Sequence, residues 1–232
     1  TGFEGAVFLY RREGCGWEPL PSLPATGLRP PGGGANAFGS DVALSADGTT
    51  LAVGARLSRS GIGSVFVYTI HASGTVTLSQ TIEPQDNTGP AEIGASITLS
   101  ADGSILAFGA PRDNNGAGAF YIYHRNAAGT FEQQGSGKFV APGAQAPASQ
   151  GTSLRLSMDG RTLAVGGPSD AGLLPGQPDL GTVWIYYRQV NTWARQARIQ
   201  PPYNGNAVRF GSAVALSLFG NNLIVGGPAE TN

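Results

Sequence analysis

Charged residues are scarce in this chain: they make up 12% of its 232 residues, and the formal net charge is -1. The positive charge comes from thirteen arginines and the single Lys138, which are spread along the sequence rather than gathered in a basic stripe. A protein that binds nucleic acid needs such a stripe to neutralise phosphates, so nucleic acid is not an expected partner.

Cysteine and long apolar runs are nearly absent as well. Cys15 is the only cysteine, which excludes an internal disulfide and with it a disulfide-rich scaffold. No apolar run approaches the roughly 20 residues that a membrane-spanning helix needs, so no transmembrane segment is expected. The chain starts at Thr1 without a methionine or a signal peptide, which favours a processed protein or a segment of a longer one.

Glycine and proline are abundant, with 36 and 16 residues, and they separate short apolar runs as turn residues do. The runs repeat. The segment "FGSDVALSADGTTLAVGA" at residues 38–55 returns as "IGASITLSADGSILAFGA", "QGTSLRLSMDGRTLAVGG" and "FGSAVALSLFGNNLIVGG" at residues 93–110, 150–167 and 210–227. In each copy the opening and closing glycines are 15 residues apart, which predicts a β-hairpin of fixed length.

Each of the first three hairpins is followed by a third apolar run that ends in tyrosine, as in "SVFVY" at residues 64–68, and by a weaker fourth run. Both alternate sets of positions in the third run are apolar, which predicts a strand covered on both faces. Four strands per repeat are typical of a propeller blade, and we expect the first blade to have strands near 40–45, 51–55, 64–69 and 77–83. The sequence therefore predicts an all-β fold, a β-propeller of four-stranded blades that spans residues 1–232 as a single domain.

The two ends of the chain carry complementary parts of one repeat. The last copy stops after two strands, while residues 1–37 begin with a third-strand run, "AVFLY", and the start of a fourth. We therefore expect four blades, at about 38–92, 93–149, 150–209, and 210–232 together with 1–37. Pairing of the N- and C-terminal strands would close the last blade and remove open sheet edges. The same match of phase also fits a fragment of a larger propeller or an assembly of two chains.

The pattern "FG…VALSADG…LAVGA…VFVY", with "GAP" at residues 109–111, resembles the FG-GAP repeat family over essentially the whole chain. That family includes the propellers of integrin α subunits and repeats of bacterial and algal surface proteins. The resemblance implies an extracellular interaction domain, commonly part of a larger adhesive or scaffold protein. Ile93 and Gln150 depart from the pattern because they stand where the other copies open with phenylalanine, so blade packing should differ there.

Integrin-type repeats often bind calcium through several Asp or Asn residues in the hairpin loop, and here each loop has at most one Asp. Calcium prefers about six to eight oxygen ligands, so we expect no metal and no cofactor. Turn chemistry explains Asp47, Asp102 and Asp159, because Asp caps local amides and the next glycine takes a positive φ. The fourth loop has Phe219 instead, a change that a turn tolerates and a metal site does not.

Residues typical of catalysis are missing too. No catalytic triad order, nucleophile elbow or phosphate-binding glycine loop is present, and His71 and His124 lack the spacing of a zinc site, so the chain is not expected to be an enzyme. Aromatic residues recur at the end of the third run and the start of the fourth: Tyr10, Tyr68, Tyr123, Tyr186, Trp17, Phe131 and Trp193. Recurrence in every repeat favours packing between blades, whereas exposed rings would serve a lectin as sugar platforms.

The loops that vary in length lie on one face of the predicted propeller, and repeat folds tend to place function on such loops. The candidate binding residues there are Arg56, Arg59, Arg112, Asp113, Asp170, Asp179, Tyr203 and Arg209. The leading hypothesis is a non-enzymatic extracellular or cell-surface adhesion or scaffold propeller that binds a protein partner through these loops. Two alternatives stay open: a lectin-like propeller that binds a cell-surface glycan, and the noncatalytic propeller of a larger surface enzyme.

Overall fold

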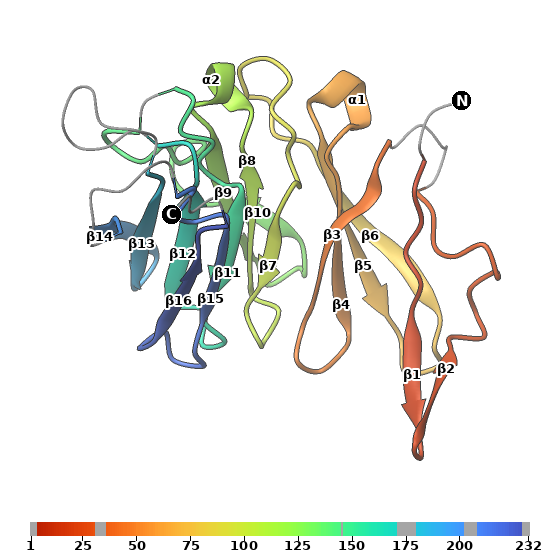
Figure 1. Ribbon diagram of the computed structural model, residues 1–232. Helices are drawn as coiled ribbons and strands as arrows, with labels where there is room; N and C mark the ends of the chain where they lie inside the picture. Colours follow the sequence, from red (N-terminus) through yellow and green to blue (C-terminus); the bar gives the residue numbers. More distant parts are fainter. Residues whose placement is uncertain (1–3, 31–35, 145, 171–179, 202–207, 229–232) are drawn as a thin grey trace.

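The chain folds into a row of antiparallel sheets in a computed structural model that describes residues 4–30, 36–144, 146–170, 180–201 and 208–228 (Figure 1). Blade 1 consists of β3 (Phe38–Leu44), β4 (Thr50–Ala55), β5 (Ser64–Ile70) and β6 (Val76–Ile82). Blade 2 consists of β7 (Ile97–Leu99), β8 (Ile105–Ala110), β9 (Ala119–Arg125) and β10 (Phe131–Gln133). Blade 3 consists of β11 (Ser153–Leu156), β12 (Thr162–Gly167), β13 (Thr182–Gln189) and β14 (Thr192–Ile199).

Two-stranded sheets flank these three blades. We call β1 (Tyr10–Glu13) with β2 (Gly16–Pro19) the N-terminal half-blade, and β15 (Ala213–Leu216) with β16 (Leu223–Gly226) the C-terminal half-blade. Two short helical turns, α1 (Ser58–Gly61) and α2 (Asp113–Gly116), follow the second strands of blades 1 and 2. Among the described residues, no helix is long and apolar enough to cross a membrane.

Within each blade, strands adjacent in sequence are hydrogen-bonded neighbours, so every blade is a four-stranded meander. The register repeats as well: Leu51 lies opposite Tyr68, and the same leucine and tyrosine positions face each other in blades 2 and 3. The first five residues of β5, β9 and β13 are buried. The prediction of an all-β fold with third strands covered on both faces is therefore confirmed, and the four strands of blade 1 agree with their predicted ranges.

The blades stack through their first strands, since β3 contacts β7, β7 contacts β11, and β11 contacts β15. Apolar side chains fill the space between successive sheets. Between blades 1 and 2, for example, Val65 and Val67 share a cluster with Ile97 and Phe108. Meanders that stack through their first strands are consistent with a propeller-like fold. The substituted opening positions are also buried: Ile93 is in this cluster, and Gln150 accepts a hydrogen bond from the Ala141 amide at 2.9 Å.

The recurring aromatic residues pack between blades where both neighbouring sheets are present. Tyr68, Tyr123 and Tyr186 are all buried, and burial raises the pKa of Tyr186 to about 12. Tyr10 and Trp17 of the N-terminal half-blade are exposed instead. The predicted pairing of the terminal strands into a closed fourth blade is not found among the described residues, because each half-blade remains two-stranded.

Candidate functional site

The loop ends of the blades surround a polar hollow of about 490 Å³. Its walls come from the segment just after a second strand and from the residues around the start of the next blade. The residues that line it are Arg56, Glu92, Ala95, Pro111, Arg112, Ser149, Thr152, Pro168, Ser169 and Arg209. The hollow thus lies where consecutive blades meet, at the ends of the second strands β4, β8 and β12.

A tight turn before each blade places three of these side chains. Glu92, Ser149 and Arg209 stand at the same repeat position and have φ values of 56°, 54° and 55°. Such left-handed backbone is uncommon for residues other than glycine, and Ala37 has it at the same position before blade 1. The turn is held by a hydrogen bond to the carbonyl of this residue, as from the Ala95 amide to Glu92 at 3.1 Å.

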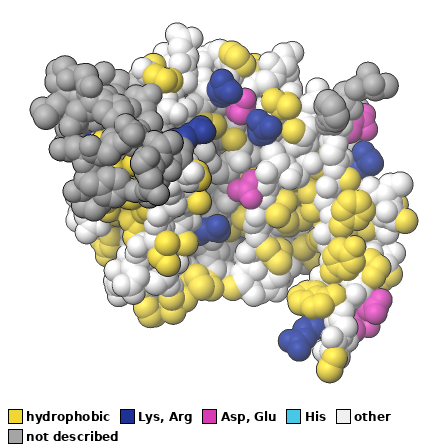
Figure 2. Space-filling view, viewed as in Figure 1, with side chains coloured by type: hydrophobic (Ala, Val, Ile, Leu, Met, Phe, Trp, Pro, Cys, Tyr) yellow, Lys and Arg dark blue, Asp and Glu magenta, His cyan; other side chains and the backbone are white. Residues whose placement is uncertain are grey.

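Opposite charges meet at the rim of the hollow, and positive charge is in excess. The Arg56 guanidinium lies 3.0 Å from the Glu92 carboxylate, and Arg112 lies 3.4 Å from its other oxygen. With Arg209, the described lining residues carry three guanidinium groups and one carboxylate, a formal balance of +2. In Figure 2, basic and acidic side chains lie next to one another on this part of the surface.

The arginines of the rim are open to solvent: the Arg112 side chain is 70% exposed and that of Arg56 is 43% exposed. Exposed ion pairs contribute only about 0–1 kcal/mol each, so their pairing with Glu92 does not commit these guanidinium groups to the fold. Guanidinium groups bind carboxylates through paired hydrogen bonds, so the hollow has the chemistry of a site for acidic groups.

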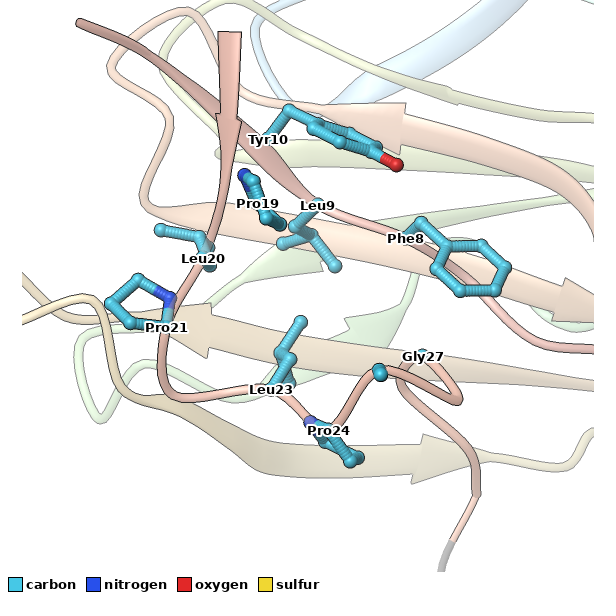
Figure 3. Close-up of a pocket in the computed structure, with 10 residues that line it drawn as sticks. Phe8, Leu9, Tyr10, Pro19, Leu20, Pro21, Leu23, Pro24 and Gly27 are labelled. Carbon is cyan, nitrogen blue, oxygen red and sulfur yellow. The ribbon is translucent and has the colours of Figure 1, made fainter.

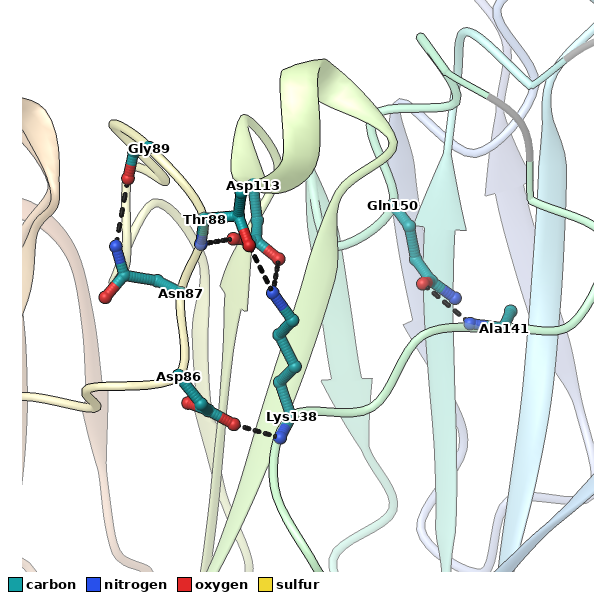
Figure 4. A network of polar contacts seen from close by, with 8 residues as sticks. All are labelled: Asp86, Asn87, Thr88, Gly89, Asp113, Lys138, Ala141 and Gln150. Atoms are coloured by element: carbon teal, nitrogen blue, oxygen red, sulfur yellow. Dashed lines mark hydrogen bonds and ion pairs between the residues drawn. The ribbon is translucent and has the colours of Figure 1, made fainter.

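Two predicted binding residues have internal partners instead. Asp113 is fully buried, and its carboxylate lies 2.5 Å from the Lys138 ammonium and accepts a hydrogen bond from the Thr88 amide (Figure 4). Asp170, at the equivalent position of blade 3, is 1% exposed and pairs with Arg198 and the Thr182 hydroxyl. Both carboxylates tie a loop after the second strand to a chain segment further out in the blade, so neither is open to a partner.

The remaining predicted binding residues differ in whether they line the hollow. Arg59 lies in α1 with a φ of 52°, and its guanidinium is 3.8 Å from the Glu83 carboxylate. The structure brings together Arg56, Arg112 and Arg209, and it keeps Arg59 outside the lining of the hollow. Asp179 and Tyr203 lie outside the described residues. Sequence reasoning missed Glu92, Ser149 and Thr152, although Arg209 occupies the same repeat position as the first two.

The Asp residues of the hairpin loops serve the turns. In blade 2, the Asp102 carboxylate accepts hydrogen bonds from the Ser100 hydroxyl at 2.5 Å and the Ser104 amide at 3.0 Å, and Gly103 has a φ of 67°. Asp47 and Asp159 make the same bonds in blades 1 and 3. The interpretation of these residues as turn residues is confirmed. Among the described residues, no three His, Cys, Asp or Glu side chains gather where they could hold a metal ion.

Asp102→Ala is expected to lower the free energy of unfolding by about 1–2 kcal/mol, because the turn loses an ionised acceptor. Burial raises the pKa of Asp102, but hydrogen bonds from Ser100 and Ser104 outweigh it and hold the pKa below its ordinary value. The stabilisation is therefore present above the unfolded pKa and lost as pH falls through the lower folded pKa. Urea titrations at pH 7 and at acid pH should show the difference between wild type and Asp102→Ala shrinking at low pH. An equal difference at both pH values would contradict this account.

A second hollow, of about 370 Å³, lies in the N-terminal half-blade and is apolar. Leu9, Leu20 and Leu23 lie around it together with prolines of the loop after β2 (Figure 3). It offers no charged group, and it is part of the exposed apolar end of the chain rather than of the loop face.

Comparisons with known proteins give information about the fold alone. No family model matches this sequence, and no curated protein does. A crystal structure of a Lactobacillus plantarum protein is similar to 97% of this chain with a TM-score of 0.60 and 17% identity, and the chain spans 58% of that protein's length. A Bacteroides fragilis protein provisionally described as a 6-phosphogluconolactonase matches 81% of this chain and 42% of its own length, with a TM-score of 0.47 and 17% identity. The first likeness concerns the fold alone, and the second is too low to bear on fold or function.

Proposed function

We propose that this chain is a non-enzymatic propeller domain that binds a protein partner through the loop face, at the extracellular side or the cell surface. The observation that supports the proposal is the polar hollow, because residues from successive blade junctions converge there with an excess of exposed guanidinium groups. The extracellular setting rests on the resemblance to FG-GAP repeats. As in other repeat folds, the blades supply a rigid frame and the junctions between them supply the variable contacts.

The partner chemistry that fits the hollow is an acidic side chain or a cluster of them. Arg56, Arg112 and Arg209 offer paired donors to carboxylates, and the hydroxyls of Ser149 and Thr152 lie in the same lining. Glu92 already pairs with two of the arginines, and Arg209 adds a third guanidinium group to the lining. This arrangement favours a partner that presents Asp or Glu on an exposed loop.

The alternatives receive less support from the geometry. A lectin with one aromatic platform per blade would expose the recurring tyrosines, and those of blades 1 to 3 are buried. A role as the noncatalytic propeller of a larger enzyme has no observation in its favour.

A separate proposal concerns the fold. We propose that the two half-blades are complementary halves of one further blade of the same kind.

Charge reversal at the hollow tests the proposal. Peptides rich in Asp and Glu should bind the wild-type chain, and the double variant Arg112→Glu/Arg209→Glu should lower their affinity by at least about 10-fold, since the loss of even one charged hydrogen bond costs about 1.5–3 kcal/mol. Isothermal titration calorimetry or fluorescence anisotropy measures the effect.

The single variant Arg112→Glu is also compared with Arg161→Glu, its matched control, because both change the net charge by the same amount and Arg161 lies in the hairpin turn at the other end of β12. Arg161→Glu should leave peptide affinity within about twofold of the wild-type value if the hollow, rather than the net charge of the chain, decides binding. Equal losses in both variants, or tighter binding of neutral glycans than of acidic peptides, would overturn the proposed site.

A further inference from the structure

The half-blades expose side chains whose repeat equivalents are buried. Ile224 of β16 is 74% exposed, whereas Ala52 at the same position of β4 is 0% exposed. Tyr10 of β1 is 56% exposed, whereas the equivalent Tyr123 is 7% exposed. In Figure 2, apolar side chains gather over the N-terminal half-blade. A groove of about 670 Å³ runs there between the half-blade and β3, and its lining includes Val42.

The contacts that join each blade to the following blade end at the C-terminal half-blade. An added Cβ at Gly54, Gly109 or Gly166 would collide with the carbonyl oxygen of the next blade's opening glycine. Gly226 stands at the same repeat position, and among the described residues only Ala213 approaches it. The opening Gly39 of blade 1 correspondingly meets residues 6 and 7 but no glycine of a preceding second strand.

The hairpin turns show the same interruption. The amide of Ala46 donates to the Ala101 carbonyl, Ala101 donates to Met158, and Met158 donates to Leu218, at 2.9, 2.9 and 3.0 Å. Leu218 is half exposed and has no following turn among the described residues. At each of these positions, the missing contacts are those that a neighbouring blade of the same repeat makes elsewhere in the chain.

We propose that the half-blades pair between two copies of this chain, head to tail. In blades 1 to 3 the second strand lies opposite the third in a fixed register, with Leu51 opposite Tyr68 and Gly54 opposite Val65. The same register places Leu223 of one copy opposite Tyr10 of the other, and Gly226 opposite Val7. The pairing completes a four-stranded blade and buries Ile224 against Val42, as Ala52 shares a cluster with Ile97 between blades 1 and 2.

A second copy is the occupant because the chain carries both complementary halves and holds them apart. In Figure 1, β1 and β2 stand at one side of the molecule, well apart from β15 and β16, which lie over blade 3, and β15 contacts β11 of that blade. Two copies related by a twofold axis form two identical junctions and leave no open blade edge. The resulting ring has eight blades, within the typical range of four to eight.

The test is the mass of residues 1–232 by sedimentation velocity or light scattering. The wild type should have twice the chain mass of 23.7 kDa. Val42→Lys and Ile224→Asp should each be monomeric, because each places a charge in both junctions. Their equimolar mixture should regain the dimer, because a heterodimer joins the introduced ammonium to the introduced carboxylate at one junction and has wild-type residues at the other. The mixture also shows that both variants fold.

Gly226→Ala provides an independent check. Its circular dichroism spectrum should match that of the wild type, since nothing crowds Gly226 within one chain, while the dimer should be lost because the methyl group would meet Gly39 of the other copy. A wild-type chain that stays monomeric at its highest soluble concentration would overturn the proposal. Failure of the mixture to regain the dimer would overturn it as well. Neither outcome would contradict the proposed binding of acidic peptides, because that proposal is tested with changes at other residues.

Discussion

Gly109→Ala is expected to lower the free energy of unfolding by at least about 3 kcal/mol, the upper end of ordinary overpacking effects. Gly109 is the penultimate residue of β8 and lies against the opening glycine of blade 3, Gly151. Its new methyl group would overlap the Gly151 carbonyl oxygen of the next blade and lie 2.6 Å from the Ser96 hydroxyl. Backbone forms most of that obstacle, so a change of side-chain rotamer cannot relieve the overlap, and the blades have to move apart.

Thermal unfolding followed by circular dichroism should show a drop in Tm of roughly 6–12 °C for a chain of this size. Gly226→Ala is the matched control, because Gly226 occupies the same repeat position and its added Cβ would have Ala213 as its nearest neighbour, at 3.5 Å. Both changes are compared in an Ile224→Asp background, which keeps the chain monomeric under the proposed pairing. The control should stay within about 0.5 kcal/mol of its parent. Similar losses at the two glycines would show that blade stacking does not decide the cost.

The repeat made most of the scaffold predictable. The fixed distance between Gly39 and Gly54, which recurs in the other copies, defines the hairpins, and apolar runs on both strand faces indicate sheets that are covered on two sides. The turn role of Asp102 was likewise readable, because Asp before Gly has one common local use. These features are local in sequence, and each is repeated, so chance matches are few.

Closure was not predictable from the same information. The phase match between the chain ends indicates a whole number of repeats, and the runs within each repeat indicate four strands per blade. Neither fixes the angle between neighbouring blades, which depends on how side chains such as Val65 and Ile97 fill the space between sheets. Rings of different size, and one chain or two, share the same repeat sequence.

The candidate site was only partly predictable because its residues belong to two categories. Arg112 and Arg209 are charged residues on variable loops and were found on that basis. Glu92 and Ser149 occupy the left-handed position before a blade, where Ala37 and Arg209 stand in the other copies, so no shared residue type marks it. The buried Asp113 was misleading in a different way, because it lies in a polar Asn- and Gly-rich loop and its partner Lys138 comes from a distant one.

Asp113→Leu is expected to lower the free energy of unfolding by about 3–5 kcal/mol, because it leaves a largely buried ammonium without its counter-ion. The Lys138 side chain is 18% exposed, and its ammonium lies 2.5 Å from the Asp113 carboxylate. Lys138→Met should cost a similar amount, since Asp113 is fully buried and has no other cation within reach among the described residues. Urea unfolding of the single variants and of the wild type measures both losses.

The double variant Asp113→Leu/Lys138→Met separates the charge effect from packing. With both charges gone, most of the loss should be regained, and a residual cost of about 1–3 kcal/mol should remain because the Thr88 amide loses its acceptor. Arg112→Met is the control, since it breaks an exposed pair with Glu92 and should cost no more than about 1 kcal/mol. If the double variant is as unstable as the sum of the two single variants, the charges are independent and the ion pair does not hold the loop. A large coupling energy instead identifies the Asp113–Lys138 pair as the link that fixes the loop of blade 2 beside the hollow.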